Sequence, residues 1–223
     1  TPLYSSAASD VYKRQKCREC SLSETRTNVV VAKGNPDAEI LIIGEGPGEQ
    51  EDITGFPFVG RAGKMLDSAL NSVEIDPLED CYITNIVKCR PPNNRKPSLE
   101  EVKSCIPWLD KQIDFLDPKI IVLAGSTAVE SFLNIKQPIS KIRGEWIKKD
   151  EFKVMPIFHP SYLLRNASKE KGAPKWLTWQ DMKEVKAALS FYDSHDPRLF
   201  RNHLAVEILY TIVSSTNYYA CKP

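Results

Sequence analysis

The sequence has no apolar run that approaches the ~20 residues of a membrane-spanning helix, and its N-terminus has no apolar core of the kind found in secretion signals. Charge of one sign is also missing, because the 223 residues carry a formal net charge of +1. These absences argue against a membrane protein, a secreted protein and a protein that binds nucleic acid through its overall charge. We therefore expect a cytoplasmic α/β protein with one domain, on which any basic surface is local.

Glycine is scarce and unevenly distributed, because six of the ten glycines lie in residues 44–63. This stretch, GEGPGEQEDITGFPFVGRAG, follows an apolar run at residues 40–43 that is typical of a buried strand. It has neither the G-x-G-x-x-G nor the G-K-[ST] pattern of a nucleotide-binding loop. Glycines after a strand let the backbone approach a ligand closely, and the carboxylates and two phenylalanines of this loop suit a ligand with polar edges and flat faces. We expect a binding and catalytic pocket here.

Four short apolar segments alternate with segments of helical periodicity, a pattern typical of a parallel sheet covered by helices on both faces. The expected strands are residues 39–43, 81–87, 119–123 and 154–158. The sequence therefore predicts a three-layer α/β/α fold with a four-stranded parallel sheet. The loops after the first, second and fourth strands are then neighbours at the carboxyl edge of the sheet, where such folds bind ligands.

Residues 16–193 form the expected domain. Residues 1–15 are polar and show no period, and we expect a disordered or non-native lead-in there. Residues 194–223 are expected to be a C-terminal tail, to which we assign no role.

Six cysteines in a cytoplasmic protein are expected to bind metal or to remain thiols rather than to form disulfides. Cys17 and Cys20 are separated by two residues, and Cys89 and Cys105 by fifteen. Four thiolates can hold either a tetrahedral zinc ion or a cubane iron–sulfur cluster, and the spacing alone does not separate the two. For the C-x-x-C motif alone, a redox pair is the alternative. Cys81 begins an expected strand and is assigned to the core.

Three long motifs follow the C-x-x-C motif in one order: GEGPGEQEDITGFPFVGRAG, TNIVKCRPPNNRKP and HPSYLLR. Together they resemble the family 4 uracil-DNA glycosylases, the thermophile-type enzymes with an iron–sulfur cluster, from about residue 17 to about residue 192. The resemblance implies hydrolysis of the N-glycosidic bond of uracil in DNA, by a monofunctional and monomeric enzyme that leaves an abasic site in double- or single-stranded DNA. It also implies a structural [4Fe–4S] cluster on Cys17, Cys20, Cys89 and Cys105, with zinc as the alternative.

Three side chains take roles in base recognition from this resemblance. Phe58 stacks on the flipped base. The Asn85 amide, an acceptor and a donor, reads N3–H and O4 of uracil and rejects cytosine, which presents the reverse pattern. His159, neutral and donating to O2, stabilises the uracil anion that develops as the bond breaks. Without the resemblance, these residues would be a core aromatic, a turn asparagine and a turn histidine.

The same resemblance places Glu51 against C5 of the base, where it excludes the methyl group of thymine. Better-known uracil-DNA glycosylases carry Asp-Pro-Tyr in the glycine loop, and the Asp acts on the attacking water. Gly46-Pro47-Gly48 stands there in this chain, so activation of the water must differ. Glu45, the backbone of Gly46 and Asn94 are the candidates for holding the water.

Contacts with DNA are expected from the last motif and from the proline-rich loop. Leu163 lies four residues after His159, where the family inserts an apolar wedge into the gap left by the flipped nucleotide; the alternative is packing under the loop. Other side chains of these loops are expected to contact phosphates, although each by itself is typical of a solvated surface. They are Ser161, Arg165, Lys88, Arg90, Arg95 and Lys96.

Two other functions fit the same fold. The first is a non-catalytic or covalent uracil-DNA-binding relative; some such relatives use a histidine in the loop after the second strand, but residues 89–97 contain no histidine. The second is a phage-type protein that partners a polymerase. The complete set of pocket residues favours the glycosylase.

Overall fold

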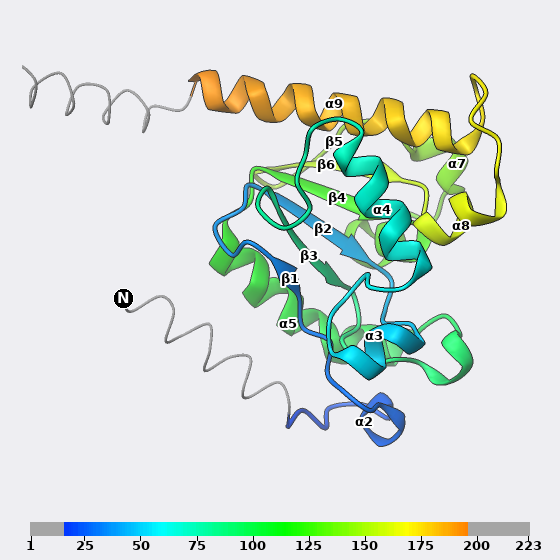
Figure 1. Ribbon diagram of the computed structural model, residues 1–223. Coiled ribbons are helices and arrows are strands. Elements are labelled where there is room, and N and C mark those ends of the chain that lie inside the picture. Colours follow the sequence, from blue (N-terminus) through cyan, green and yellow to red (C-terminus); the bar gives the residue numbers. More distant parts are fainter. Residues whose placement is uncertain (1–15, 196–223) are drawn as a thin grey trace, which may run out of the picture. The chain divides into compact units, whose positions relative to one another are not determined.

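The computed structural model describes residues 16–195 (Figure 1). Contacts between Cα atoms divide the chain into one unit of residues 1–186 and a second of residues 187–223. The first unit holds the whole sheet, and of the second unit the structure describes residues 187–195, the C-terminal end of a helix. The lead-in expected at residues 1–15 and the expected tail beyond residue 195 lie outside the described residues.

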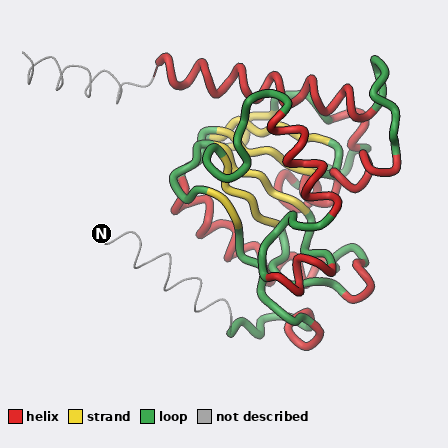
Figure 2. Tube along the Cα trace, viewed as in Figure 1, coloured by secondary structure: helices red, strands yellow, loops and turns green. Residues whose placement is uncertain are grey.

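The sheet of the first unit has six strands in the order β1-β3-β2-β4-β6-β5. Figure 2 shows strands in yellow and helices in red. The four inner strands are parallel, which confirms the predicted fold class. The sheet is larger than the predicted four strands, because β1 and β5 pair antiparallel at its two edges. These edge strands have two and three residues and are not fully buried, so they lack the apolar run that identifies the inner strands. The bounds are β1 Lys33–Gly34, β2 Ile40–Gly44, β3 Cys81–Asn85, β4 Ile120–Ala124, β5 Ile147–Lys149 and β6 Phe152–Ile157.

Helices connect the strands, and Ser98 and Glu101 form a capping box at the start of one of them. The Ser98 hydroxyl accepts from the Glu101 N–H at 3.2 Å, and the Glu101 carboxylate accepts from the Ser98 N–H at 2.7 Å. Residues 137–149 contain a helical turn before β5. Among residues 16–195, no helix is both long and apolar enough to cross a bilayer. The helices are α2 Leu22–Thr25, α3 Glu49–Thr54, α4 Arg61–Asn71, the 3-10 helix η1 Pro92–Asn94, α5 Leu99–Leu116, α6 Ser126–Leu133, α7 Ile139–Ile142, α8 Pro160–Arg165 and α9 Pro174–His195.

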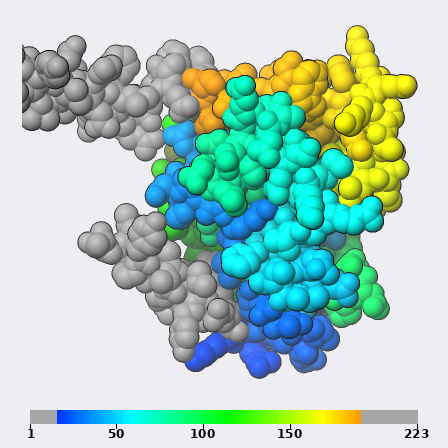
Figure 3. Space-filling model, viewed as in Figure 1, coloured from blue at the N-terminus to red at the C-terminus, as the bar shows by residue number. Residues whose placement is uncertain are grey.

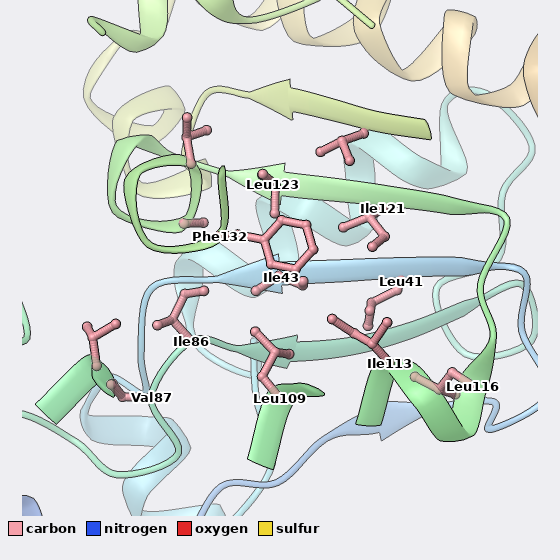
Figure 4. Packing of buried hydrophobic residues seen from close by; sticks show 14 of the residues in the cluster. Leu41, Ile43, Ile86, Val87, Leu109, Ile113, Leu116, Ile121, Leu123 and Phe132 are labelled. Atoms are coloured by element: carbon pink, nitrogen blue, oxygen red, sulfur yellow. The ribbon is translucent and has the colours of Figure 1, made fainter. Parts of the chain in front are cut away.

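Both faces of the inner sheet are buried. Leu41, Ile121 and Val154 are cross-strand neighbours on one face, where they pack with apolar side chains of α5, α6 and α7 (Figure 4). Their chain neighbours Ile42 and Val122 point to the opposite face and are fully buried as well. Because burying each such side chain contributes ~1.5–3 kcal/mol, this double burial holds the strand register. The register in turn decides which loops meet at the carboxyl edge.

Three of the loops at this edge carry the sequence motifs. The glycine-rich loop with α3 and the start of α4 follows β2, the proline-rich loop with η1 follows β3, and α8 follows β6. The residues of α3 and α4, in cyan, lie on the face of the molecule seen in Figure 3. The loops predicted to be neighbours therefore lie at one edge, as parallel strands require.

Candidate active site

A cavity of about 300 Å³ opens where these loops meet. This volume is at the lower end of the ~300–1,000 Å³ typical of small-molecule sites. The walls come from the glycine-rich loop, the proline-rich loop and the start of α8. They include nine of the predicted site residues, which are Glu45, Gly46, Glu51, Phe58, Asn85, Asn94, Arg95, His159 and Ser161.

Phe58 forms an apolar wall of the cavity and is 6% exposed. Its backbone is left-handed, with φ 53°, a conformation that costs ~1–2 kcal/mol for a residue with a side chain. Two glycines make room for it: a Cβ at Gly63 would lie 1.9 Å from the Phe58 carbonyl oxygen, and a Cβ at Gly44 would lie 2.5 Å from the ring. Lys33 Nζ donates to the same carbonyl at 3.0 Å. The glycines of this loop therefore serve to place an aromatic ring.

Asn85 ends β3 beside this ring, with Oδ1 only 2.4 Å from where a Cβ on Gly44 would lie. The residue is 3% exposed. Its backbone carbonyl accepts from Lys88 Nζ at 2.5 Å, but within residues 16–195 its side-chain amide has no hydrogen-bond partner. Leaving a buried polar group unsatisfied costs ~1–3 kcal/mol. The amide is therefore suited to a ligand that brings its own donor and acceptor into the cavity.

His159 is the N-cap of α8. Its Nδ1 accepts from the Ser161 N–H at 3.2 Å and lies 2.7 Å from Ser161 Oγ. Because Nδ1 is the acceptor, we assign the proton of the neutral ring to Nε2. Burial, and secondarily the charge of Arg165, lowers the pKa of His159 to about 4. The ring is therefore a neutral N–H donor at pH 7, with its centroid 6.3 Å from that of Phe58.

The two carboxylates of the cavity differ in their partners. Glu51 accepts from three backbone N–H groups, those of Gly48 at 3.1 Å, Val59 at 3.0 Å and Gly60 at 2.8 Å. It therefore ties the start of α3 to the N-cap of α4 and is held in place by both. Glu45 is half-buried, and its carboxylate has no partner in the part of the chain that the structure describes. Glu45 is the carboxylate that remains available to a ligand.

Asn94 reaches the cavity from η1 and has a left-handed backbone, with φ 54°, which asparagine tolerates better than most residues. Arg90 Nε donates to Asn94 Oδ1 at 2.8 Å, and the Arg90 guanidinium also lies 3.7 Å from Glu49. The side-chain oxygen of Asn94 is therefore engaged, and Arg90 sets the orientation of the amide.

Two of the residues predicted to contact DNA, Lys88 and Leu163, are buried in this structure. Lys88 is 2% exposed, and its ammonium donates to Thr84 Oγ1 at 2.7 Å and to the Asn85 carbonyl. These acceptors compensate a charge that burial would otherwise make costly. Leu163 is 2% exposed because α8 packs against α4; it packs under the loop, whereas Tyr162 is 39% exposed.

Sequence reasoning missed a second group of polar residues on the other side of His159. A neighbouring cavity of about 540 Å³ shares Glu45, His159 and Ser161 with the first. A signal was present, because Gly125-Ser126 follows a predicted strand at the same carboxyl edge, like the three motif loops. The additional lining residues include Gly125, Ser126, Ser140 and Tyr162, together with Arg165, which was predicted to contact DNA.

The cysteines predicted to bind metal surround one small cavity formed by the N-terminal segment, the proline-rich loop and α5. Arg26 donates to Cys89 Sγ at 3.2 Å and to the Cys17 carbonyl at 2.7 Å. The Lys88 N–H donates to Cys105 Sγ at 3.3 Å. In the described residues, no group of three or more His, Cys, Asp or Glu side chains is arranged to hold a single metal ion. The four cysteines around this cavity are Cys17, Cys20, Cys89 and Cys105.

Comparison with known proteins agrees with this arrangement. Residues 31–183 match the model of the uracil DNA glycosylase superfamily. A type-4 uracil-DNA glycosylase of Thermotoga maritima is 51% identical over 160 residues, which are 70% of this chain and 82% of that protein. Type-4 uracil-DNA glycosylases of Archaeoglobus fulgidus and Saccharolobus solfataricus are 44% and 41% identical, over 66% and 79% of this chain and 78% and 83% of those proteins. The matched residues contain the inner sheet and the whole lining of the first cavity, and the chain accordingly belongs to the uracil DNA glycosylase superfamily, in its type-4 group.

Proposed function

We propose that this protein is a DNA-repair glycosylase that hydrolyses the N-glycosidic bond of uracil in DNA and leaves an abasic site. The observation that carries the proposal is the Asn85 amide, which is buried, lines the same cavity as the aromatic wall and the neutral histidine, and has no partner among residues 16–195. Membership of the superfamily and the names of the relatives support the same activity.

Recognition of the base begins outside the duplex, because a stacked base cannot reach a cavity of this kind. We expect the ring of Phe58 to stack on the flipped uracil, worth ~1–3 kcal/mol. The Asn85 carbonyl then accepts from N3–H, and its NH₂ group donates to O4. Cytosine has an acceptor at N3 and a donor at C4. It would place acceptor against the Asn85 carbonyl and donor against the Asn85 NH₂ group, and both groups of the amide would stay unsatisfied.

Cleavage of the bond leaves positive charge on an oxocarbenium-like sugar and negative charge on the departing uracil. His159 Nε2–H donates to O2 of that anion. Because the pKa of the ring is about 4, the histidine is already neutral at pH 7 and donates its Nε2–H without a prior change in protonation. Removing one preorganised donor of this kind costs ~2.7–4 kcal/mol of transition-state stabilisation.

Glu45 is our candidate for holding the attacking water. Its carboxylate is available, and its negative charge also suits the developing sugar cation. Gly46 contributes backbone alone, since a Cβ there would lie 2.7 Å from Val87 Cγ2. Asn94 contributes its NH₂ group, because Arg90 already occupies its oxygen.

Exclusion of thymine is assigned to Glu51. Its three backbone hydrogen bonds hold the carboxylate in the wall of the cavity, so that it cannot move aside for a 5-methyl group without breaking them. We therefore propose that Glu51 acts as a rigid barrier and takes no part in proton transfer.

We propose that a [4Fe–4S] cluster is bound by Cys17, Cys20, Cys89 and Cys105. The donor set fits, because four cysteines line one cavity and N–H groups donate to two of their sulfurs, as is typical around thiolate ligands. A single zinc ion on the same four thiolates is the alternative. When bound, the cluster supplies a cross-link between three segments of the chain.

The cofactor is tested by the colour and metal content of the purified protein. We expect visible absorbance and iron at four atoms per chain, both lost in Cys89→Ser. Cys81→Ala is the matched control, because Cys81 is buried in β3 and does not line this cavity. A colourless wild-type protein with stoichiometric zinc would contradict the cluster.

DNA contacts are proposed for the polar groups around the two cavities. Ser161, Arg165, Arg90 and Arg95 remain at or near the surface, and Ser126 joins them from the neighbouring cavity. We expect these groups to lie close to the sugar and phosphates of a flipped nucleotide, where hydrogen bonds position the strand without reading its sequence.

The activity is tested by alkaline strand cleavage of labelled oligonucleotides that carry U, T or C opposite G, and U in a single strand. We expect cleavage at U alone. Asn85→Ala should lower kcat/KM for U at least ~100-fold, on the scale of a lost transition-state donor. Asn71→Ala, at the exposed end of α4, is the matched control. Equal cleavage by wild type and Asn85→Ala would rule out the proposed recognition.

A binding protein without turnover is the competing function, and the same oligonucleotides distinguish it. Such a protein would shift uracil-DNA in a gel and produce no abasic sites, and a covalent adduct would survive denaturing electrophoresis. The absence of histidine from residues 89–97 leads us to expect turnover and no adduct.

A further inference from the structure

Glu101 receives more hydrogen bonds than its place in a helix requires. As the third residue of α5, it accepts from the Ser98 N–H at 2.7 Å. It also accepts from Arg95 Nη1 at 2.8 Å and Nη2 at 2.6 Å, a two-pronged ion pair, and from Ser21 Oγ at 3.3 Å. Its side chain is 4% exposed. A glutamine would complete the capping box equally well, so the negative charge has another role.

The partners of Glu101 connect two sites. Arg95 lines the first cavity. Ser21 directly follows Cys20, and Cys105 lies one turn after Glu101 on the same helix. The segment that carries the first cysteine pair therefore lies against the same carboxylate and keeps it away from water. In such surroundings a two-pronged pair of arginine and carboxylate is both strong and directional.

The pair with Glu101 fixes the Arg95 guanidinium but does not engage all of its N–H donors. Nη1 also donates to the Lys96 carbonyl at 3.1 Å, so Glu101 and this carbonyl account for three of the five N–H groups of the guanidinium. The Nε–H and the second N–H of Nη2 have no partner among residues 16–195. The Arg95 side chain is 46% exposed, against 4% for its partner. The buried end of the pair is thus an anchor, and the exposed end presents two donors at the rim of the cavity.

We propose that Glu101 is a positioning residue that holds Arg95 in one orientation at the rim of the uracil pocket, where the two remaining donors bind a phosphate beside the flipped nucleotide. This inference rests on the proposed glycosylase function. Arginine has many rotamers, and an arginine already ordered loses less entropy when it meets the phosphate. Glu101 contributes to phosphate binding by orienting Arg95. It does not contribute by attracting DNA, because its negative charge reduces the positive charge that DNA encounters.

Kinetics of Glu101→Gln provide the first test, because this variant keeps the capping box and removes the ion pair. We expect KM for a uracil-containing oligonucleotide to rise roughly ten- to thirtyfold, the range that the rotamer freedom of one arginine implies, with kcat within about threefold. Arg95→Gln should raise KM by a similar factor, and the double variant should add little to either. An unchanged KM in Glu101→Gln, or effects of the two substitutions that multiply in full, would overturn the proposal.

Two control variants separate positioning from stability. Glu130→Gln removes another ion pair from the same loop, the one between Lys96 Nζ and Glu130 at 2.6 Å, and leaves Arg95 untouched. Ser98→Ala removes the N-cap hydroxyl of α5 and keeps the pair with Arg95. Both should leave KM within about twofold of wild type, even where Ser98→Ala lowers the urea midpoint more than Glu101→Gln does. A KM increase in Ser98→Ala as large as that in Glu101→Gln would assign the effect to stability and overturn the proposal.

Trypsin provides a measurement that does not depend on activity. In residues 90–97, the bonds after Arg90 and Lys96 precede proline and resist the protease, so the bond after Arg95 is the cleavable one. We expect Glu101→Gln to accelerate cleavage there at least fivefold, and Glu130→Gln to leave the rate unchanged. If the wild type excises no uracil, the proposed function fails, and the cleavage rate alone decides whether Glu101 orders Arg95. An unchanged rate in Glu101→Gln would overturn that ordering.

Discussion

The first cavity and the surroundings of Glu101 both include residues of the proline-rich loop, but they differ in whether their polar groups have hydrogen-bond partners. In the cavity, the amide of Asn85 and the carboxylate of Glu45 have no partners among the described residues. Around Glu101, each carboxylate oxygen accepts at least two hydrogen bonds. Unsatisfied groups reduce the stability of the folded chain, so their collection in one cavity indicates a site completed by substrate. The satisfied groups around Glu101 indicate a frame that holds the site.

Removing the histidine donor should have the largest effect on the cavity side of this comparison. We expect His159→Ala to lower kcat ~100- to 1,000-fold with little change in KM, because the donor acts on charge that appears in the transition state. Single-turnover excision measures this directly. Ser161→Ala should have a much smaller effect, since the Ser161 N–H still directs Nδ1. An equal loss in both variants would show that the Ser161 hydroxyl is as essential as the ring.

Changing a glycine that supports the aromatic wall should damage stability and recognition together. Replacing a glycine by alanine inside a helix usually stabilises the helix by ~1 kcal/mol. At Gly63 in α4, however, the new Cβ would lie 1.9 Å from the Phe58 carbonyl oxygen. We expect the opposite sign, a loss of ~1–3 kcal/mol in the free energy of unfolding, together with weaker binding of free uracil. Ser68→Ala, at an exposed position of the same helix, is the control for urea unfolding. A stabilised Gly63→Ala would contradict the geometry of Phe58.

Acid should affect the first cavity through protonation of His159. The pKa of His159 is about 4 in the folded protein and 6.5 ordinarily, so the unfolded chain binds the extra proton first as pH falls. This residue therefore lowers the free energy of unfolding between pH 6.5 and about 4, by ~3 kcal/mol, and adds no further slope below that. Activity should persist to about pH 5 and fall near pH 4, as the donor becomes charged. Urea unfolding of wild type and His159→Gln with equal pH slopes would disagree with this assignment.

The smallest effects should separate an exposed cation from a buried one. Arg165→Gln should weaken DNA binding modestly and reduce the slope of log K against log salt by ~1. Lys88→Met should leave the salt slope unchanged and lower the urea midpoint, because Lys88 donates to acceptors inside the protein. Fluorescence anisotropy over a range of salt concentrations gives both slopes. A reduced slope in Lys88→Met would show that its ammonium reaches DNA after all.

Much of this comparison was predictable from sequence patterns. The inner strands β2 and β4 were found because they are apolar throughout and buried on both faces. The edge strands were missed because two or three half-buried residues carry no periodicity. The glycine-rich loop was first considered a close-approach site for a ligand, and its glycines instead make room for the Phe58 backbone and ring. The S-x-x-E pattern at residues 98–101 is typical of a capping box, but no local pattern indicates the pairing of its glutamate with Arg95.

By itself, the sequence determined the fold class and the chemical groups at the ends of the strands, because burial periodicity and motif order are local properties of the chain. Only the tertiary structure decided which of those groups are available. The side chains of Lys88 and Leu163 are turned inward, Glu51 and Glu101 are engaged by hydrogen bonds from other segments, and Asn85 and Glu45 remain without partners in the described residues. The physical reason is that hydrogen bonding and desolvation depend on neighbours distant in sequence, which is also why the charge state of His159 follows from its burial and not from its motif.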